Sequence, residues 1–381
     1  MGSLDDSISS GSVATQENDA KAGSQAPTMI ALALSGGGVR AMAFHLGVLL
    51  FLAENRALER VSHVSTVSGG SLLVGLMLRQ TDMQWPRSST YESEVYQELR
   101  RQMCSRSLMG ASIRQLLLPW NWIHLLSRAE LVAKALRGWG VKSCLSDIPA
   151  VPEWSINGTT AENGRRFRFK RDSMGDWRLG YASARNFPLA RAMAVSAAFP
   201  GGIGPLSISS GNYVWKRRPT WGIDVPEVEI SLPFKRLRLC DGGVYDNLGL
   251  EPFYDAGKRA AKLPGVAIYV SDAGAPLAQG PSAGPLSPWR VKRLADIMSE
   301  QSRTLRVRSF ISYLESSKQP LGAYAYIAAE ADGTDPKVGN FARTFPTGLQ
   351  RLKAKQFDAI AGFGYAVAKN VERLHGLLGQ L

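Results

Sequence analysis

Apolar and polar positions along the chain follow two alternating patterns, one typical of buried strands and one of buried helices. Short apolar runs of strand length are followed by longer apolar stretches with helical spacing. The pattern predicts strands at residues 29–34, 61–67, 236–240, 266–271 and 323–328, with strand-like alternation over 149–187. It predicts helices at residues 39–54, 71–79, 91–107, 111–138, 188–198 and 288–315, and from about 354 onward. Strands that alternate with helices are typical of a three-layer α/β fold, with a mostly parallel central sheet and helices on both faces.

Residues 1–28 differ from the rest of the chain because they contain no apolar run. They are rich in Ser, Gly, Asp, Gln and Ala, so we expect a disordered N-terminal tail and not a signal peptide. Residues 29–381 are predicted to form a single domain, with a helical insertion at about 85–145 and a C-terminal helical extension at about 288–381. Residues 275–288 are rich in Pro, Gly and Ser and are expected to be a mobile linker.

Three of the predicted strands end in residue types suited to acyl transfer. Ser68 lies in the run VSGG at 67–70, and a serine on such a strand-to-helix turn exposes its hydroxyl group. The run SGGG at 35–38 also precedes a helix, and the free N–H groups of a helix N-terminus attract negative charge. Asp241 ends a third strand and supplies a carboxylate that can take the proton of the serine. If the strands are parallel, these groups gather in one crevice and suffice for acyl transfer by a Ser–Asp pair without histidine.

Each of these segments also has a more ordinary explanation. The strict pattern Gly-x-Ser-x-Gly is not met, because Thr66 replaces its first glycine. The run at 35–38 is not followed by the Gly-Lys-Ser or Gly-Lys-Thr of a nucleotide-binding loop, and Ala41 stands where the last glycine of Gly-x-Gly-x-x-Gly would be. An Asp-Gly-Gly sequence is usually a turn. The order of the three segments, each at a strand end, is therefore the more specific signal.

In this order, the segments resemble the patatin-like phospholipase family, from about residue 29 to about residue 251. The matching runs are LSGGGVR at 34–40, VSGG at 67–70, SAAFP at 196–200 and DGG at 241–243. The resemblance implies a lipid acyl hydrolase, either a phospholipase A or a lysophospholipase or esterase, in which Ser68 is the nucleophile and Asp241 the base. It assigns the N–H donors of an oxyanion hole to Gly36, Gly37, Gly38 and Gly69, and supporting roles to Arg40, Gly70, Gly242 and Gly243.

Histidine and cysteine are scarce in the chain. The four histidines are His45, His63, His124 and His375, and the three cysteines are Cys104, Cys144 and Cys240. None of the histidines follows a late strand, where an α/β-hydrolase carries its catalytic histidine, and His45 is expected to pack in the core. An odd number of widely spaced cysteines argues against a disulfide framework and for a reducing compartment. We therefore predict no metal site and no cofactor.

The chain is strongly basic, with 45 Lys and Arg against 32 Asp and Glu and a formal net charge of +13. For an enzyme that acts on lipids, this charge predicts attraction to an anionic membrane surface. No nucleic-acid-binding module accompanies the basic residues, so no specific nucleic-acid partner is expected. No stretch reaches the roughly eighteen apolar residues needed to span a bilayer. We therefore expect a cytoplasmic protein that attaches at most peripherally to membranes; its oligomeric state is not predicted.

The run LLLPWNWIHLL at 116–126 is apolar but too short to span a bilayer. Its simplest interpretation is a cap over the core. The alternative is that Trp120 and Trp122 contact a lipid interface or form part of a lid, helped by Arg114 and Arg128.

Three functions are compatible with these patterns. The first is a hydrolase of phospholipids or other acyl-ester lipids that uses Ser68 and Asp241. The second is a lipid-binding or regulatory protein on the same scaffold with little turnover, supported only by Thr66. The third is a basic protein associated with nucleic acid, which rests on charge alone.

Overall fold

The computed structural model describes residues 29–125, 127–200, 202–219, 225–277, 288–317 and 321–380. The predicted tail at 1–28 and most of the predicted linker at 275–288 lie outside the described residues. Among the described helices, none is both long enough and apolar enough to cross a membrane.

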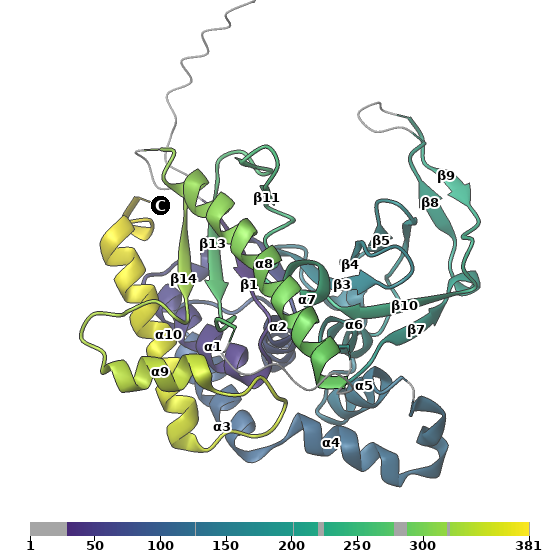
Figure 1. The fold of residues 1–381 in the computed structure, drawn as a ribbon, viewed down its shortest axis with the longest axis horizontal. Helices are drawn as coiled ribbons and strands as arrows, with labels where there is room; N and C mark the ends of the chain where they lie inside the picture. Colours follow the sequence, from purple (N-terminus) through teal and green to yellow (C-terminus); the bar gives the residue numbers. More distant parts are fainter. Residues whose placement is uncertain are drawn as a thin grey trace, which may run out of the picture.

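A twelve-stranded mixed sheet forms the centre of the described fold (Figure 1). Its central strands are parallel, as predicted, in the order β14 (Gly322–Tyr326), β13 (Val266–Asp272), β1 (Met29–Leu34), β2 (Val61–Thr66) and β3 (Glu153–Thr160). Beyond β3 the sheet continues antiparallel through β4 (Arg166–Phe169), β5 (Ser173–Asp176), β6 (Gly180–Ser183), β8 (Trp215–Arg217) and β9 (Val228–Ile230). The strands β7 (Leu206–Ser209) and β10 (Arg236–Asp241) pair with each other, and β10 also pairs with β3. A separate small pair consists of β11 (Tyr254–Asp255) and β12 (Ala260–Ala261).

Helices cover both faces of the parallel strands, as predicted, because successive strand residues point to opposite faces. In β1, Ile30, Leu32 and Leu34 belong to the core on one face, whereas Ala31 and Ala33 belong to the core on the other. The first face carries α1 (Gly38–Glu54), α2 (Gly69–Gln80), α3 (Gln97–Ser105), α6 (Leu189–Ser196) and α10 (Ala354–His375), with α9 (Pro336–Thr344) packed on α10. The second face carries the chain that follows α7 (Gly243–Asp246), and α8 (Pro288–Leu314), which crosses in front of the strands in Figure 1.

The predicted helices between residues 91 and 138 are more broken than expected. They consist of the π-helix η2 (Tyr91–Tyr96), α3, α4 (Leu108–Arg114), the 3-10 turns η3 (Gln115–Leu117) and η4 (Pro119–His124), and α5 (Ala129–Gly138). One break comes at Leu118, whose backbone is extended with φ −95° and ψ 112°. A residue before proline avoids the helical conformation, so Pro119 prevents one continuous helix. Further short 3-10 turns are η1 (Leu58–Arg60), η5 (Leu145–Asp147), η6 (Ser210–Asn212) and η7 (Leu378–Gln380).

The C-terminal part of the chain, interpreted from the sequence as a helical extension, also contributes to the central sheet. β14 forms the parallel edge beside β13, and α10 packs along α1. The two helices approach so closely that a Cβ atom added to Gly47 would lie 1.8 Å from the carbonyl oxygen of Ala361. The helix that carries the glycine run at its start is therefore fixed by the last long helix of the chain.

A buried ion pair holds α8 against the sheet. Asp272, at the end of β13, is fully buried, and its carboxylate accepts hydrogen bonds from Arg303 of α8 at 2.5 Å and from the Tyr324 hydroxyl at 2.6 Å. Its second oxygen accepts the N–H of Gly274 at 2.7 Å. Asp272 thus links β13, β14 and α8, and Arg303 balances its charge.

Arg303→Met is expected to lower the free energy of unfolding by about 3–5 kcal/mol, because it removes the cation that hydrogen-bonds the buried Asp272 carboxylate. Urea unfolding followed by circular dichroism measures this change. Arg373→Met is the matched control: its ion pair with Asp332 is exposed on both sides, so its loss should cost less than about 1 kcal/mol. Adding Asp272→Asn to the Arg303→Met variant should recover part of the loss. Equal effects of the two arginine substitutions would contradict this assignment.

Candidate active site

Ser68 lies on a sharp turn between β2 and α2. Its backbone has φ 49° and ψ −114°, a conformation that a residue with a side chain adopts only under strain. The turn is fixed on both sides: the N–H of Ser68 donates to the carbonyl oxygen of Ser196 at 3.1 Å, and the N–H of Gly70 donates to that of Val67 at 2.9 Å. The Ser68 residue is partly exposed at the N-terminus of α2. A strand-to-helix turn of this kind presents a hydroxyl group at the edge of the sheet.

The glycine run before α1 lies directly against this turn. A Cβ atom on Gly36 would lie 3.1 Å from the Cβ atom of Ser68, and one on Gly69 would lie 2.4 Å from the carbonyl oxygen of Gly38. Gly37 has φ 141° and Gly38 has φ 58°, so the chain turns into α1 in a conformation that favours glycine. The close approach and the backbone conformation together exclude side chains from this junction.

Three N–H groups at this junction have no hydrogen-bond acceptor within the described part of the chain. They belong to Gly37, Gly38 and Gly69. The N–H of Gly36 is different, because it donates to the carbonyl oxygen of Asn247 at 3.0 Å. Of the glycines assigned to an oxyanion hole by resemblance, Gly36 is therefore already hydrogen-bonded in this structure.

Arg40 ties the start of α1 to distant segments. Its side chain is buried and donates to the carbonyl oxygens of Arg343 at 3.1 Å, Phe345 at 2.9 Å and Ala273 at 2.9 Å. Burial lowers its pKa to about 10, so it remains charged at neutral pH. The N–H of Ala273 donates in turn to the hydroxyl of Ser35 at 2.8 Å. The segment that precedes the glycine run is thus held by residues from the end of β13.

Asp241 reaches the site because β10 and β2 pair with successive parts of the same edge of β3. Thr66, the last residue of β2, pairs with Ile156 of β3, and Asp241 pairs with Gly158, two residues further along the same strand. The other edge of β3 is occupied by β4 over these residues. The sequence pattern places Asp241 at the end of a parallel strand, but β10 is antiparallel to β3. Since β2 and β10 run in opposite directions, they meet end to end, and Ser68 follows the junction.

The Asp241 carboxyl group is buried and faces the Ser68 side chain. Burial raises its pKa from 3.8 to about 7, although hydrogen bonds from the N–H of Gly243, at 2.7 Å, and from the Ser68 side chain act in the opposite direction. The backbone of Asp241 is also fixed. The Asp241 N–H donates to the carbonyl oxygen of Ala198 at 3.0 Å, and the Thr159 hydroxyl donates to the backbone carbonyl oxygen of Asp241 at 2.9 Å. A carboxyl group with a pKa near neutrality can accept and return a proton at neutral pH.

The other glycines of the predicted site permit close backbone approaches. A Cβ atom on Gly70 would lie 2.6 Å from the carbonyl oxygen of Leu34, and one on Gly242 would lie 2.5 Å from that of Asn157. A Cβ atom on Gly243 would lie 2.7 Å from the side-chain oxygen of Asn247. Side chains at these positions would therefore push the strands and the turn apart.

Thr66, which departs from the Gly-x-Ser-x-Gly pattern, belongs to a buried chain of hydroxyl groups beneath the turn. Its hydroxyl accepts the indole N–H of Trp154 at 2.9 Å and hydrogen-bonds the Ser71 hydroxyl at 2.7 Å. The Ser71 hydroxyl lies 2.8 Å from that of Ser196, which also accepts the N–H of Ser68 at 3.0 Å. A threonine at this position therefore supports the turn.

Sequence reasoning missed Asn247 and Asn157, which contact the site from two sides. Asn247 accepts the Gly36 N–H, and its side-chain oxygen lies 2.3 Å from the position of a Cβ atom on Gly36. The side chain of Asn157 donates to the carbonyl oxygen of Thr66 and to the Ser65 hydroxyl, both at 2.9 Å. Single asparagines carry no motif; the nearest signal was that Asn247 follows the DGG run by four residues.

Within the described part of the chain, none of the four histidines hydrogen-bonds Ser68 or Asp241. His45 is a buried core histidine, as predicted: it hydrogen-bonds the Ser271 hydroxyl at 2.7 Å and the carbonyl oxygen of Ser35 at 3.0 Å, and burial lowers its pKa to about 4. The others lie in β2, in η4 and at the end of α10. Among the described residues, no three His, Cys, Asp or Glu side chains are grouped so that they could hold a metal ion.

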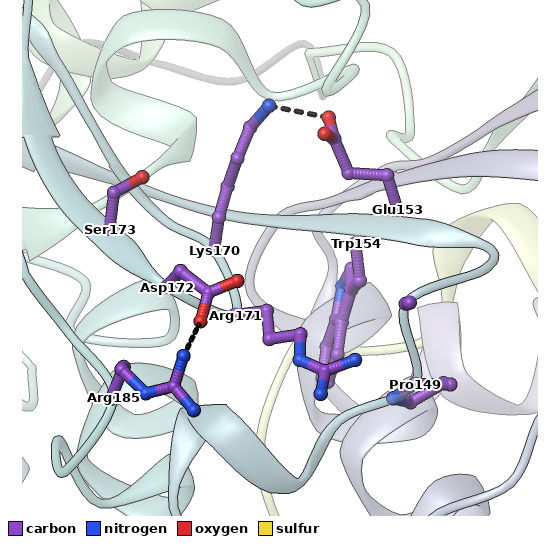
Figure 2. A pocket seen from close by; sticks show the side chains of 9 residues that line it. Pro149, Glu153, Trp154, Lys170, Arg171, Asp172, Ser173 and Arg185 are labelled. Atoms are coloured by element: carbon purple, nitrogen blue, oxygen red, sulfur yellow. Dashed lines mark hydrogen bonds and ion pairs between the residues drawn. The ribbon is translucent and has the colours of Figure 1, made fainter.

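A cavity of about 410 Å³ lies at the start of β3, at the end away from the residues that pair with β10 (Figure 2). Its lining includes Trp154 and Arg171, and two ion pairs that join Lys170 to Glu153 and Arg185 to Asp172. Neither Ser68 nor Asp241 lines this cavity. We therefore place the candidate site at the Ser68 turn, where a hydroxyl group, free N–H groups and a carboxyl group meet.

Comparison with known proteins agrees with this architecture. The family model described as patatin-like phospholipase matches residues 32–254, which is more than half of the chain. The chain belongs to the patatin-like phospholipase family. The matched patatin-like region contains β1, α1, β2 and α2, and it ends just beyond Asp241.

Solved structures with a similar fold include human GIVD cytosolic phospholipase A2, with a TM-score of 0.51 and 14% identity, over 93% of this chain and 60% of that chain. A complex of that protein with methyl gamma-linolenyl fluorophosphonate and terbium chloride has a TM-score of 0.51 and 14% identity, over 92% and 59% of the two chains. VipD from Legionella pneumophila has a TM-score of 0.40 and 13% identity, over 92% and 67%. This patatin-like chain therefore spans about 60% of the length of the human phospholipase, and the low identity shows a shared fold only. The comparison with curated proteins found no matching sequence.

Proposed function

We propose that this protein hydrolyses fatty acyl esters of lipids, as a phospholipase A, a lysophospholipase or an esterase, with Ser68 as nucleophile and Asp241 as base. One observation carries the proposal: a serine on a strained strand-to-helix turn faces a buried carboxyl group whose pKa is raised to about 7. Membership of the patatin-like phospholipase family supports a lipid substrate.

The proposed reaction needs only these two side chains and a water molecule. Asp241 takes the proton of Ser68 as the serine oxygen attacks the ester carbonyl carbon, and the carbonyl oxygen becomes an oxyanion. When the ester C–O bond breaks, Asp241 returns the proton to the leaving alcohol, and the acyl group stays on Ser68. Water then attacks the acyl carbon while Asp241 takes its proton. When the bond between the acyl carbon and the Ser68 oxygen breaks, Asp241 returns the proton to Ser68, and the fatty acid is released.

We assign the stabilisation of the oxyanion to the N–H groups of Gly37, Gly38 and Gly69. These groups surround the Ser68 turn and have no acceptor in the part of the chain that is described. Prearranged N–H donors stabilise a developing negative charge without reorganisation during the reaction. The N–H of Gly36 donates to Asn247, so in this arrangement Gly36 provides the close approach to Ser68 while Asn247 holds the loop.

The direct test is a panel of substrates with the purified chain. Diacyl phospholipids, lysophospholipids and short-chain esters are compared, and released fatty acid is measured by mass spectrometry. Because human GIVD cytosolic phospholipase A2 was solved with methyl gamma-linolenyl fluorophosphonate, an acyl-chain fluorophosphonate is a suitable probe of the nucleophile. Release of fatty acid together with labelling at Ser68 is the expected result. Absence of both from the folded protein would contradict the proposal.

Activity is expected to rise with pH and to reach half its maximum near the Asp241 pKa of about 7. The base is active only when ionised, so activity is lost as the pH falls through this value. The value of kcat/KM for an uncharged ester, measured from about pH 5 to about pH 9, tests this. Circular dichroism at each pH controls for unfolding. A profile that is already flat above about pH 5, as for an unperturbed aspartate, would contradict the buried-base assignment.

The two other functions have less support. The lipid-binding interpretation rests on Thr66, whose hydroxyl is hydrogen-bonded to Trp154 and Ser71 beneath an intact turn. The nucleic-acid interpretation rests on the net charge of +13 alone. Salt-sensitive binding to duplex DNA, with no ester hydrolysis, would favour the latter.

A further inference from the structure

An exposed apolar strip lies at residues 109–125, across α4, η3 and η4. Leu117, Trp120 and Ile123 have 77%, 67% and 80% of their surface exposed. The strip comprises these and the other large exposed apolar side chains of the segment, Met109, Ile113, Trp122 and Leu125. From the sequence the simplest interpretation of 116–126 is a cap over the core, with Trp120 and Trp122 as the alternative lipid contacts. The cap interpretation is wrong for Leu117, Ile123 and Leu125, which are exposed.

Two polar groups of the strip, the Asn121 side chain and the Trp122 indole N–H, are hydrogen-bonded inside the fold. Asn121 is fully buried between the exposed tryptophans and donates to the backbone carbonyl oxygen of Gln115 at 2.8 Å, while Lys134 donates to its side-chain oxygen. The indole N–H of Trp122 donates to the carbonyl oxygen of Leu116 at 2.8 Å. Internal hydrogen bonds therefore hold the strip in shape while its apolar side chains face outward.

The charged side chains of the segment that carries the strip have one sign. Residues 106–128 contain no Asp or Glu, and Arg106, Arg114 and Arg128 are all exposed. An acidic side chain close to this segment, Glu130, is paired with Arg191. An apolar surface whose own segment carries only cationic charge matches an anionic lipid surface, where apolar groups enter the headgroup boundary and arginines meet phosphate. A neutral apolar partner would not account for the missing acidic residues.

The strip is connected to both sides of the Ser68 site. At its start, the N–H of Met109 donates to the carbonyl oxygen of Leu349, next to Gly348, which accepts the N–H of Val39 at the beginning of α1. Beyond its other end, the Ser127 hydroxyl donates at 3.0 Å to the carbonyl oxygen of Pro205, in the chain between α6 and β7. Figure 1 shows α4 at the lower edge of the view, the side towards which β13 points and where the parallel strands end.

The chain next to Asp241 adds two further exposed apolar groups. Phe199, which follows the Ala198 carbonyl that accepts the Asp241 N–H, is 48% exposed. Val244, which follows Gly243 in α7, is 53% exposed. Apolar surface therefore borders the site on the Asp241 side as well as at the strip.

We propose that the strip at 109–125 is the surface by which this protein docks on an anionic lipid bilayer, with Arg106, Arg114 and Arg128 bound to headgroup phosphates. In this orientation the edge of the sheet that carries Ser68 faces the membrane, so an ester can reach the site without crossing bulk water. The use of the docking surface rests on the proposed lipid hydrolysis, but docking itself does not require turnover.

The test is co-sedimentation of the full chain carrying Ser68→Ala with vesicles of phosphatidylcholine alone, or mixed with about one-third phosphatidylserine. We expect binding to the anionic vesicles, weakened as salt rises beyond about 0.15 M. Trp120→Ser with Trp122→Ser should weaken binding about tenfold or more, because their burial against lipid is lost. Leu117→Ser with Ile123→Ser should act in the same way and leaves the Trp122 hydrogen bond in place.

Matched controls separate the strip from general effects. Trp177→Ser changes a 46% exposed tryptophan on the turn between β5 and β6 and should not alter binding. Arg106→Gln, Arg114→Gln and Arg128→Gln together should weaken binding by up to about 100-fold at low salt. Replacing the exposed residues Lys216, Arg217 and Arg218 by Gln removes the same charge and should weaken vesicle binding much less.

Unchanged binding by both strip variants, or an equal loss with Trp177→Ser, would overturn the proposal. The parent protein could instead be a dimer in analytical ultracentrifugation, with strip variants that are monomers and bind vesicles unchanged. The strip would then pair two copies of the chain, and this result would also overturn the docking proposal. Because every binding measurement uses Ser68→Ala, these outcomes are independent of whether Ser68 is the nucleophile.

Discussion

Ser68→Ala is expected to abolish both ester hydrolysis and reaction with a fluorophosphonate, while the protein stays folded. Loss of the attacking hydroxyl removes the covalent intermediate, which costs about four to six orders of magnitude in kcat in serine hydrolases. The fold should persist, because the Ser68 backbone keeps its hydrogen bonds to Ser196. Hydrolysis of a fluorogenic ester and mass spectrometry of the labelled protein measure the two effects.

Ser71→Ala is the matched control for this experiment. Ser71 lies on the same helix, but its hydroxyl is buried and hydrogen-bonded to Thr66 and Ser196. Its loss should cost about 1–3 kcal/mol of stability and leave fluorophosphonate labelling at Ser68 intact. If Ser68→Ala were labelled at another residue at the rate of the parent protein, the nucleophile would have to be reassigned.

Asp241→Asn is expected to lower kcat by about ten thousandfold, because an amide cannot take the proton of Ser68. Its side-chain oxygen can still accept the N–H of Gly243, so the turn should keep its shape. Steady-state kinetics with the same fluorogenic ester measure the loss. The residual activity should also no longer change with pH near 7, since the titrating carboxyl group is gone.

The histidines provide the comparison for the Asp241 result. His63, His124 and His375 replaced singly by Gln should retain activity, and His45→Asn should lower it only through loss of buried hydrogen bonds to Ser35 and Ser271. Thermal unfolding identifies variants that lose activity because they unfold. A folded histidine variant as inactive as Asp241→Asn would replace the proposed dyad by a triad.

Local patterns predicted the first half of the site well. The predicted strands at 29–34 and 61–67 correspond to β1 and β2, and the helices at 39–54 and 71–79 to α1 and α2, each within two residues. These elements have apolar periods that residues nearby in the sequence determine. Because β1 and β2 are adjacent and parallel, the glycine run and Ser68 necessarily lie at the same edge of the sheet.

The surface of the helical region could not be predicted in the same way. An apolar run such as 116–126 is compatible with a buried cap and with an exposed lipid contact, since both need the same residues. Its outward orientation depends on Asn121, which lies inside and bonds Gln115 and Lys134. The side-chain oxygen of Asn121 finds its donor on α5, at Lys134, a residue that no local pattern of the run indicates.

The sequence by itself determined the α/β class and the strand-to-helix turns at Gly38 and Ser68, because periodicity and glycine runs act locally; Asp241 was singled out by the order of the segments and by the resemblance to a family. Tertiary structure decided how Asp241 reaches Ser68: β10 is antiparallel and meets the end of β2 along β3, a pairing between segments far apart in the chain. It also decided the Asp241 pKa of about 7, since burial depends on the surrounding chain as a whole. Long-range pairing and desolvation leave no local pattern, and for that reason they appear only in the folded molecule.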